Sequence, residues 1–506
     1  MTNTGDAMSK KIIIVGGGIA GLSAGIYAQK AGFDSEIYEK HIVAGGQCTG
    51  WKRGNFYIDN CISWMTCAKK GCKVYTIWKE TGFIGENTLI RQHDAYYTSE
   101  LNGQKVTLWA DLEKAEKELC TISPEDTKKI REFINDVKMA QSLQVPCDKP
   151  IDLMNIFELT ALGLSMWKMA PVMLKYSKIS IEEWASGFKN PVIRKAFMDY
   201  LPKDYLAYIF ITAYATIASG GGGVPEGGST PAVNRMVEKY LNLGGKIYTG
   251  KPVKEIKIAG NRTTGIILEN GDEISGDYVI ASCDTHHTFE KLLDARYMPP
   301  ELVKAYADRE ANKLGSTFQA AFAYDGKSTI GRRFYYDCSG FNLAGRKITR
   351  MNVKNYSAFE PAYAPEGKDL IQVKLLQTED EYLYWQDLRL NDKARYDAEK
   401  KQAAADMERM IVEQFPEAEG KLRLLDVWSP YTYTRFYNAY RGVYMTFIMT
   451  KKTKIPLNIP GVIKGIKNVF LAGQWLMLPG GLPVALTSGK FAIQRILKAE
   501  GKSLKI

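Results

Sequence analysis

Three glycines near the N-terminus have the spacing of a loop that binds a dinucleotide. Gly16, Gly18 and Gly21 follow an apolar, β-branched run at residues 12–15, which predicts a parallel strand buried on both faces. In this spacing the first glycine permits a tight turn, the second lets backbone approach a pyrophosphate, and the third lets a helix pack on the strand. Glu39 follows 23 residues after Gly16, which suits a carboxylate that accepts hydrogen bonds from ribose hydroxyls. Together these residues predict a dinucleotide site.

A second glycine-rich loop lies near the C-terminus. Residues 468–472 predict a strand that leads into Gly473 and Gln474, and the run PGGLP then places Pro483 at the first position of a helix. The positive end of that helix would stabilise the negative charge that reduction places on a flavin ring. No second GxGxxG follows a predicted strand, so we expect no separate domain for a nicotinamide nucleotide.

Further motifs are spread along the chain. They are GGGIAGLSAG, FYID, VPEGGSTPAVNRM, GGKIYTGKPVKEI, ASCD and LAGQWLMLPGGLPVALTSG. In these motifs the chain resembles the phytoene-desaturase-type flavoproteins, which include carotenoid desaturases and isomerases and retinol saturases within the amine-oxidase-like group. The resemblance spans both ends and the middle and is weak in the apolar helical segments. It implies non-covalently bound FAD and a long unsaturated lipid or isoprenoid substrate.

The resemblance also implies which residues bind FAD. Gly16, Gly18 and Gly21 would hold the pyrophosphate, Glu39 would bind the adenosine ribose, and Val253 would meet the adenine through its backbone. The other cofactor-binding residues that it implies are Lys40, Gly45, Gly46, Gln47, Gly473, Gln474, Gly481, Leu482, Pro483 and Val484.

Three of these segments would lie toward the flavin side of the cofactor. Residues 45–47 would approach the flavin, 473–474 would contact the ribityl–phosphate region, and 481–484 would lie beneath the ring. Many relatives carry arginine after the glycine pair, where this chain has Gln47. The change removes a fixed positive donor at that point.

The sequence identifies no catalytic residue. His286 and His287 could do acid–base work, but we expect a surface or structural role for the pair. The aromatic run YTYTRFYNAYRGVY at residues 431–444 could form the wall of an apolar cavity or a packed strand, and Trp64 and Met65 are similar candidates. Hydride transfer to or from flavin N5 needs mainly orientation and exclusion of water, so the lack of an acid–base pair does not argue against activity.

The eight cysteines form no CxxC pair. Cys48, Cys61, Cys67 and Cys72 are the densest group, but zinc sites usually have shorter paired spacings. We therefore expect reduced cytosolic thiols packed near the cofactor, and no metal.

Charge and hydropathy limit the partners. The net charge is +11, but no basic run with interleaved aromatic residues indicates nucleic acid binding. Dispersed positive charge could favour an anionic membrane surface. No apolar stretch is long enough to span a bilayer, and the apolar segments at 159–176 and 205–219 are expected to be core helices, although they could line a substrate channel or enter one leaflet. The N-terminus shows no secretory signal, so we expect a cytoplasmic protein that could lie peripherally on the inner face of the membrane. The sequence does not indicate an oligomeric state.

A chain of 506 residues predicts more than one lobe. We expect an α/β and α+β protein in which residues 1–75, 221–288 and 460–506 form a discontinuous Rossmann-like FAD-binding domain. Residues 76–220 and 289–459 would form a substrate domain of mixed sheet and apolar helices, and helices are expected directly after the N-terminal loop. Within these parts, the sequence predicts a helix that Thr230 caps and a charged helix over about 393–414.

The predicted function is that of an FAD-dependent oxidoreductase that desaturates or saturates carbon–carbon bonds of an apolar polyene, isoprenoid or lipid. Three alternatives stay open: a redox-neutral flavin-dependent double-bond isomerase, an amine oxidase, and a flavin-binding protein without turnover. The substrate, the direction of the reaction and the electron donor or acceptor do not follow from the sequence.

Overall fold

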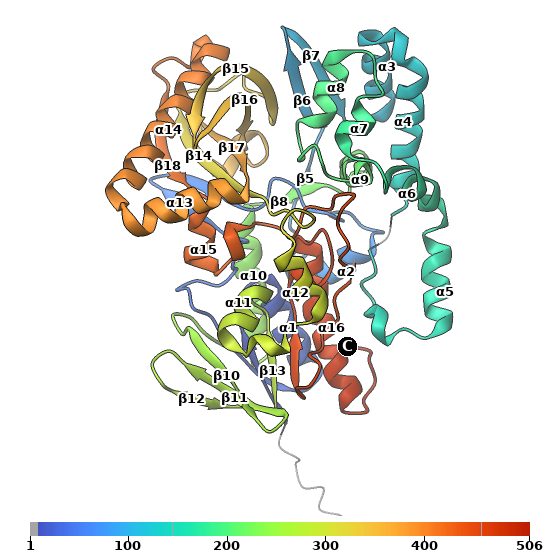
Figure 1. The fold of residues 1–506 in the computed structure, drawn as a ribbon, viewed down its shortest axis with the longest axis vertical. Helices are drawn as coiled ribbons and strands as arrows, with labels where there is room; N and C mark the ends of the chain where they lie inside the picture. The colour runs from blue at the N-terminus through green and yellow to red at the C-terminus, as the bar shows by residue number, and fades with distance from the viewer. Residues whose placement is uncertain (1–8, 144, 457) are drawn as a thin grey trace, which may run out of the picture.

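The computed structural model describes residues 9–143, 145–456 and 458–506. A five-stranded parallel sheet of order β19-β13-β1-β2-β9 forms the base of the molecule in Figure 1. Its strands are β1 (Lys11–Val15), β2 (Asp34–Tyr38), β9 (Lys246–Tyr248), β13 (Tyr278–Ala281) and β19 (Val469–Leu471). This sheet therefore combines N-terminal, central and C-terminal parts of the chain. The α/β fold class is confirmed, while the predicted domain boundaries stay a prediction.

Helices and a small sheet cover the two faces of the parallel sheet. On one face lie α1 (Ile19–Lys30), α10 (Ser229–Asn242) and α16 (Leu482–Ala499), and α16 packs closely on α1. A Cβ at Gly489 would lie 2.4 Å from the Ala20 carbonyl oxygen, so glycine permits this close contact. On the other face lies a three-stranded antiparallel sheet of β10 (Val253–Ala259), β11 (Arg262–Leu268) and β12 (Glu273–Ser275).

A seven-stranded sheet of order β18-β14-β17-β16-β15-β6-β7 forms the upper part of the molecule. Its strands are β6 (Ala95–Leu101), β7 (Gln104–Trp109), β14 (Ser316–Tyr324), β15 (Phe334–Leu343), β16 (Arg346–Asn355), β17 (Asp369–Gln377) and β18 (Leu422–Trp428). The helices α13 (Glu379–Asn391) and α14 (Lys393–Gln414) pack on it. The expectation that helices directly follow the N-terminal loop is wrong, because the β6–β7 hairpin forms there. Its strand β6 pairs with β15, which is distant in the sequence.

A helical lobe stands beside this sheet, on the right in Figure 1. Its helices are α3 (Leu112–Ile122), α4 (Thr127–Ala140), α5 (Ile156–Ser165), α6 (Ala170–Tyr176), α7 (Ile181–Ala185), α8 (Pro191–Met198) and α9 (Ala207–Ala218). The core prediction holds for α9, where six residues are buried. It is wrong for α5, which has no buried residue and lies at the edge of the molecule.

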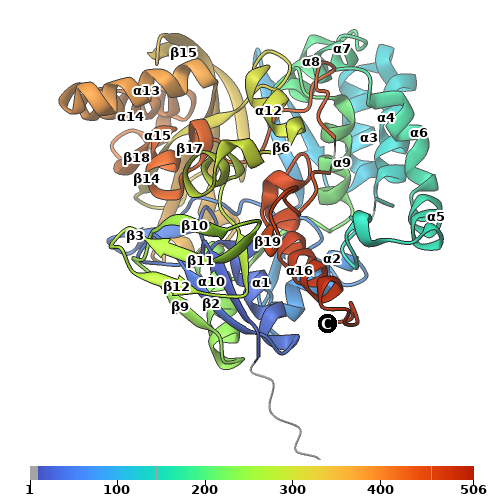
Figure 2. The ribbon, with the colours of Figure 1, turned by 60° about the horizontal axis from the view of Figure 1, so that its bottom comes forward.

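The remaining elements connect these layers. They are β3 (Gly50–Arg53), β4 (Phe56–Asp59), β5 (Ile90–Gln92), β8 (Gly223–Pro225), α2 (Lys73–Glu80), α11 (Thr285–His287), α12 (Pro300–Ala307) and α15 (Tyr431–Tyr437). Figure 2 shows the C-terminal α16 directed from the upper layers toward the base, beside α1.

Three local predictions need correction. Thr230 does not cap α10, because Gly228 is the N-cap and the Thr230 hydroxyl instead accepts a hydrogen bond from the Gly50 N–H. The aromatic run at 431–444 contains the helix α15 and no strand. Cys67 and Cys72 are joined in a disulfide, with Cα atoms 5.5 Å apart, so the expectation of reduced thiols is wrong for this pair. The turn before α2 brings these two residues together.

Candidate functional site

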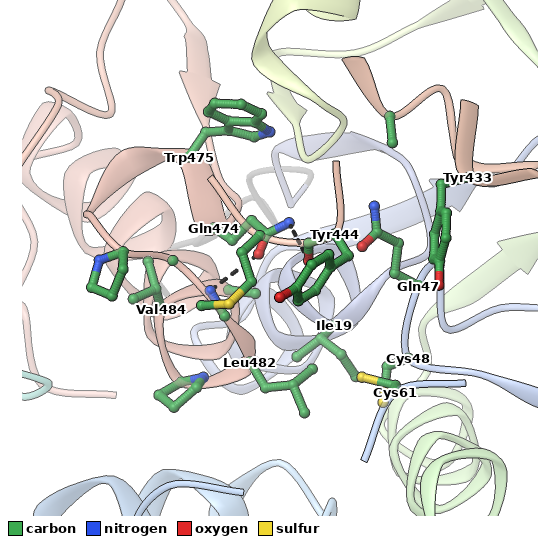
Figure 3. Close-up of a pocket in the computed structure, with 18 of the residues that line it drawn as sticks. Ile19, Gln47, Cys48, Cys61, Tyr433, Tyr444, Gln474, Trp475, Leu482 and Val484 are labelled. Atoms are coloured by element: carbon green, nitrogen blue, oxygen red, sulfur yellow. Dashed lines mark hydrogen bonds between the residues drawn. The ribbon is translucent and has the colours of Figure 1, made fainter. Parts of the chain in front are cut away.

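A cavity of about 1210 Å³ lies between the parallel sheet, the seven-stranded sheet and the helical lobe. Every residue predicted to bind the cofactor lines it except Gly21. Figure 3 shows part of this cavity, where Ile19 at the start of α1, Gln47, and the C-terminal residues Gln474 and Leu482 face the same space. The structure thus brings together residues from the N-terminal and C-terminal parts of the chain.

The N-terminus of α1 opens directly into the cavity. Gly18 is the N-cap and supplies no side-chain hydrogen bond, so the first N–H groups of the helix have no side-chain partner at this cap. Gly16 has φ +103°, which suits glycine at the turn. A Cβ on Gly18 would have no protein atom closer than 3.9 Å, so the fold does not require glycine there. Open space and free donors at Gly18 suit the close approach of a pyrophosphate.

Gly21 has a different role from the other two glycines. It does not line the cavity, and a Cβ there would lie 2.0 Å from the Gly16 carbonyl oxygen. Glycine at this position therefore permits α1 to pack on the turn, as the sequence pattern predicts for the third glycine. Direct contact of Gly21 with the pyrophosphate stays a prediction that the lining of the cavity does not support.

The acidic residue after β2 also faces the cavity. Glu39 is 7% exposed, and its carboxylate accepts hydrogen bonds from the N–H groups of Gly17 and His41, both at 2.7 Å. These bonds fix the carboxylate beside the glycine loop. The adjacent Lys40 donates from its ammonium to the Asn438 side-chain oxygen at 2.5 Å. Lys40 therefore links the nucleotide loop to the segment after α15.

The loop after β2 and the antiparallel sheet complete this end. The Gly45 N–H donates to the Gly17 carbonyl oxygen at 2.9 Å, which holds the two glycine loops together. Gln47 stands where many relatives have arginine. Its side-chain amide donates to the Val443 carbonyl oxygen at 3.1 Å. Gly46 and Val253 line the cavity beside them.

The N-terminus of α16 forms the second uncapped helix end at the cavity. Gly481 is the N-cap, with φ +89° and no side-chain hydrogen bond, and its own N–H donates to the Gln474 side-chain oxygen at 3.1 Å. Leu482 is the first helical residue, so Pro483 occupies the second position, one later than predicted. Val484 and Gly473 line the same wall.

Two uncapped helix N-termini, close-approach glycines and a fixed carboxylate fit an FAD molecule. The α1 end suits its phosphates and the α16 end suits a ring that becomes negative on reduction. The contacts of each predicted residue with the cofactor stay predictions.

The candidate catalytic residues lie beside this site. His287 lines the cavity, and burial, followed by the charge of Lys40, lowers its pKa to about 4. Burial raises the pKa of Asp284 to about 6, although its carboxylate accepts hydrogen bonds from the Tyr440 N–H and the Trp475 indole. His286 stacks on Tyr440 with ring centroids 3.9 Å apart, which is a packing role. A neutral, hydrogen-bonded His287 suits a structural role better than proton transfer.

The other end of the cavity is apolar. It is lined by Met166, Met169, Met173, Tyr208, Ile209 and Ala213 of the helical lobe. Of the aromatic run, Tyr433 and Tyr444 also line the cavity, while Phe436 and Tyr437 line it near the nucleotide loop, where the Phe436 ring packs edge-on against His41. The aromatic run thus forms a cavity wall, as one of its two interpretations predicts. Trp64 and Met65 also line the cavity.

The seven-stranded sheet adds charged residues that the sequence did not single out. Arg350, Asn352 and Lys354 of β16 and Lys374 of β17 line the cavity. The signal for the three β16 residues is the alternation along RMNVKN, which places every second side chain on one face of the strand. The sequence does not show which face lines a cavity. Among the residues that the structure describes, no group of three His, Cys, Asp or Glu side chains could hold a metal ion.

Comparison with known proteins identifies the family. A sequence model described as flavin containing amine oxidoreductase matches residues 19–497. The chain belongs to this family. It is an FAD-dependent oxidoreductase, which confirms the resemblance to the amine-oxidase-like flavoproteins and the cofactor.

Similar proteins extend over the whole chain. The 4,4'-diaponeurosporene oxygenase of Staphylococcus haemolyticus is 22% identical over 97% of this chain and 98% of its own. The protein of the same name from Staphylococcus aureus strain MW2 is 20% identical over 98% and 100%. Two solved structures share the fold. An oxidoreductase from Methanosarcina mazei has a TM-score of 0.56 and 17% identity, with 96% of this chain and 100% of its own covered. Putrescine oxidase bound to putrescine has a TM-score of 0.60 and 12% identity, with 97% of this chain and 99% of its own covered.

Proposed function

We propose that this FAD-dependent oxidoreductase desaturates or saturates carbon–carbon bonds of a long, carotenoid-type polyene. The observation that carries the proposal is one cavity that joins the predicted FAD residues to the apolar wall of the helical lobe. The names of the staphylococcal relatives, which mark a carotenoid substrate, support the same substrate class.

FAD, when bound, supplies hydride acceptance or donation at its flavin ring. The chain's own residues orient the substrate and exclude water. Met169 and Tyr444 line the cavity, and α9 lines it with Tyr208, Ile209 and Ala213. Desaturation removes a hydride and a proton from adjacent carbons, and saturation returns them. Burial raises the pKa of Tyr444 well above its ordinary value, so its hydroxyl would stay protonated as a donor in saturation.

The charges in the cavity disfavour an amine substrate. Lys374 lines it without an acidic partner among the described residues, and its positive charge would repel a protonated amine there. The fold shared with putrescine oxidase keeps amine oxidation as the second candidate.

A polyene substrate also implies access from a membrane, and we propose that the chain acts on the inner, anionic surface of a bilayer. Phe157, Trp167 and Leu174 are 81%, 66% and 76% exposed. Met166, Met169 and Met173, in the same segment, line the cavity, so the exposed apolar side chains lie on a segment that also borders the cavity. The exposed Lys168 and Lys178 add positive charge that suits anionic lipids. No described helix is both long and apolar enough to cross a bilayer.

Product mass tests the reaction type. The FAD-loaded protein would be incubated with a carotenoid hydrocarbon in detergent, with an artificial electron acceptor or a reductant, and the product analysed by mass spectrometry. A loss or gain of two hydrogens is expected. An unchanged mass with a shifted double bond would identify an isomerase, and conversion of putrescine alone would identify an amine oxidase.

A further inference from the structure

Two lysines lie side by side on the sheet face that covers the cavity. Lys354 of β16 pairs with Gln372 of β17, and Lys374 is two residues further along the same strand. Because side chains alternate along a strand, both lysines lie on the same face. Both line the cavity, and Lys354 is only 3% exposed.

The two arginines of β16 that line the cavity have carboxylate partners, but these two lysines do not. Arg350 makes two hydrogen bonds of 2.6 Å to Asp199, and Arg346 binds Glu381 at 2.6 Å. Among residues 9–143, 145–456 and 458–506, no carboxylate lies within 4.0 Å of the ammonium group of Lys354 or Lys374, and neither donates a side-chain hydrogen bond. The two ammonium groups are therefore the unpaired charges of this sheet face.

The surroundings make these charges costly without a partner. Burial lowers the pKa of Lys374 to about 8 and that of Lys354 well below its usual value, and the positive charge of Arg333 acts in the same direction on both. The ammonium of Lys374 lies 4.2 Å from the centroid of the Tyr444 ring, which favours its charged form but does not neutralise it. An anion bound between the lysines would restore the pairing that buried charges require.

We propose that Lys354 and Lys374 form a cationic subsite that binds a carboxylate at one end of the substrate. This inference rests on the proposed function and narrows its substrate class from a polyene hydrocarbon to a polyene acid. A carboxylate carries one negative charge that two lysines can balance, and the subsite offers a phosphate no unpaired arginine fork, because Arg346 and Arg350 are already paired. Strand side chains supply only the two point charges here.

The test compares an acid with its neutral ester. trans-Parinaric acid, a fluorescent linear polyene with one carboxylate, and its methyl ester would be titrated into the FAD-loaded protein, with fluorescence as the readout. We expect the acid to bind about ten-fold or more tightly than the ester, the size expected for a charge-assisted hydrogen bond. In the K354M/K374M double variant the two affinities should become equal, while the ester binds as it does to the wild type.

A matched control separates charge from folding. Lys347 is exposed, lies on the same strand, and points to the opposite face, so K347M should keep the preference for the acid. Flavin content should be unchanged in all variants, since removing an unpaired buried charge does not destabilise the fold. Equal binding of acid and ester by the wild type, or a preference that survives K354M/K374M, would overturn the subsite alone. Failure of the FAD-loaded protein to bind either probe would overturn the proposed polyene function and the subsite with it.

Discussion

The two ends of the cavity differ in which groups of the chain line them, backbone at one end and side chains at the other. At the nucleotide end, the space is lined mainly by backbone, with glycines and two uncapped helix N-termini, and by one carboxylate. At the substrate end, side chains of the helical lobe, the aromatic run and the seven-stranded sheet line it. Backbone requirements leave a pattern in the sequence, whereas a side-chain surface can be formed by many sequences. The same cavity therefore has one end that a motif reveals and another that only the fold reveals.

The substitution Gly18→Val separates cofactor binding from folding at the nucleotide end. A Cβ there has no protein atom closer than 3.9 Å, so the variant should fold, while its side chain would occupy the space of the pyrophosphate. We expect FAD affinity to fall by more than about 100-fold, as for a clash of about 3 kcal/mol. Visible absorbance and circular dichroism would measure flavin content and folding.

Gly21→Val provides the contrast. Its Cβ would lie 2.0 Å from the Gly16 carbonyl oxygen, so this variant should lose folded protein as well as flavin. A folded Gly18→Val protein with stoichiometric FAD would refute the placement of the pyrophosphate.

Lys374→Met tests the unpaired charge at the substrate end through stability. The pKa of Lys374 falls from its ordinary 10.5 to about 8, chiefly because of burial, with Cys61 opposing and Arg333 adding to the shift. Between these pH values the unfolded chain holds the proton and the folded chain does not, so the stability of the wild type rises with pH. The free energy of unfolding of the wild type, measured relative to that of Lys374→Met, should rise by about 3 kcal/mol between pH 8 and pH 10.5 and should not change with pH below pH 8. Denaturant unfolding of both proteins across this range would measure it, and parallel curves would contradict the buried position of the charge.

Ala213→Trp tests whether the two ends act independently. Ala213 lies on α9 and lines the substrate end, so a large side chain there would fill the cavity away from the FAD residues. We expect turnover of a polyene to fall by about 30-fold through lost positioning, with flavin content unchanged. Loss of flavin together with activity would show that the ends are coupled.

The double substitution F157E/L174E tests the membrane surface beside the substrate end. Both side chains are largely exposed, so folding and flavin content should not change. Binding to liposomes that contain anionic lipid should weaken by about ten-fold, because apolar area and charge attraction are both reduced. Leu390→Glu is the control, since Leu390 is 64% exposed on α13, outside the helical lobe. Equal flotation of the wild type and the double variant would exclude this surface as the membrane contact.

The sequence predicts the nucleotide end well because each motif has a local physical cause. The strand β1, the helix α1 and the charged helix α14 form where predicted. The exposed face of α5 was missed, because an apolar composition alone does not show whether a helix is covered. The subsite of Lys354 and Lys374 was also missed, since it depends on the register of β16 and β17. The disulfide of Cys67 with Cys72 depends on a turn that no spacing rule specifies.

Anaerobic reduction of the flavin tests the central claim most directly. The FAD-loaded protein would be mixed, without oxygen, with an excess of a linear polyene or polyene acid in detergent. A separate sample would be mixed with putrescine, and the visible absorbance of the flavin would be followed in both. If the enzyme is poised for desaturation, the polyene bleaches the flavin; if it is poised for saturation, the polyene restores the absorbance of pre-reduced enzyme. Putrescine does neither. Bleaching by putrescine, with no response to any polyene in either redox state, would contradict the account.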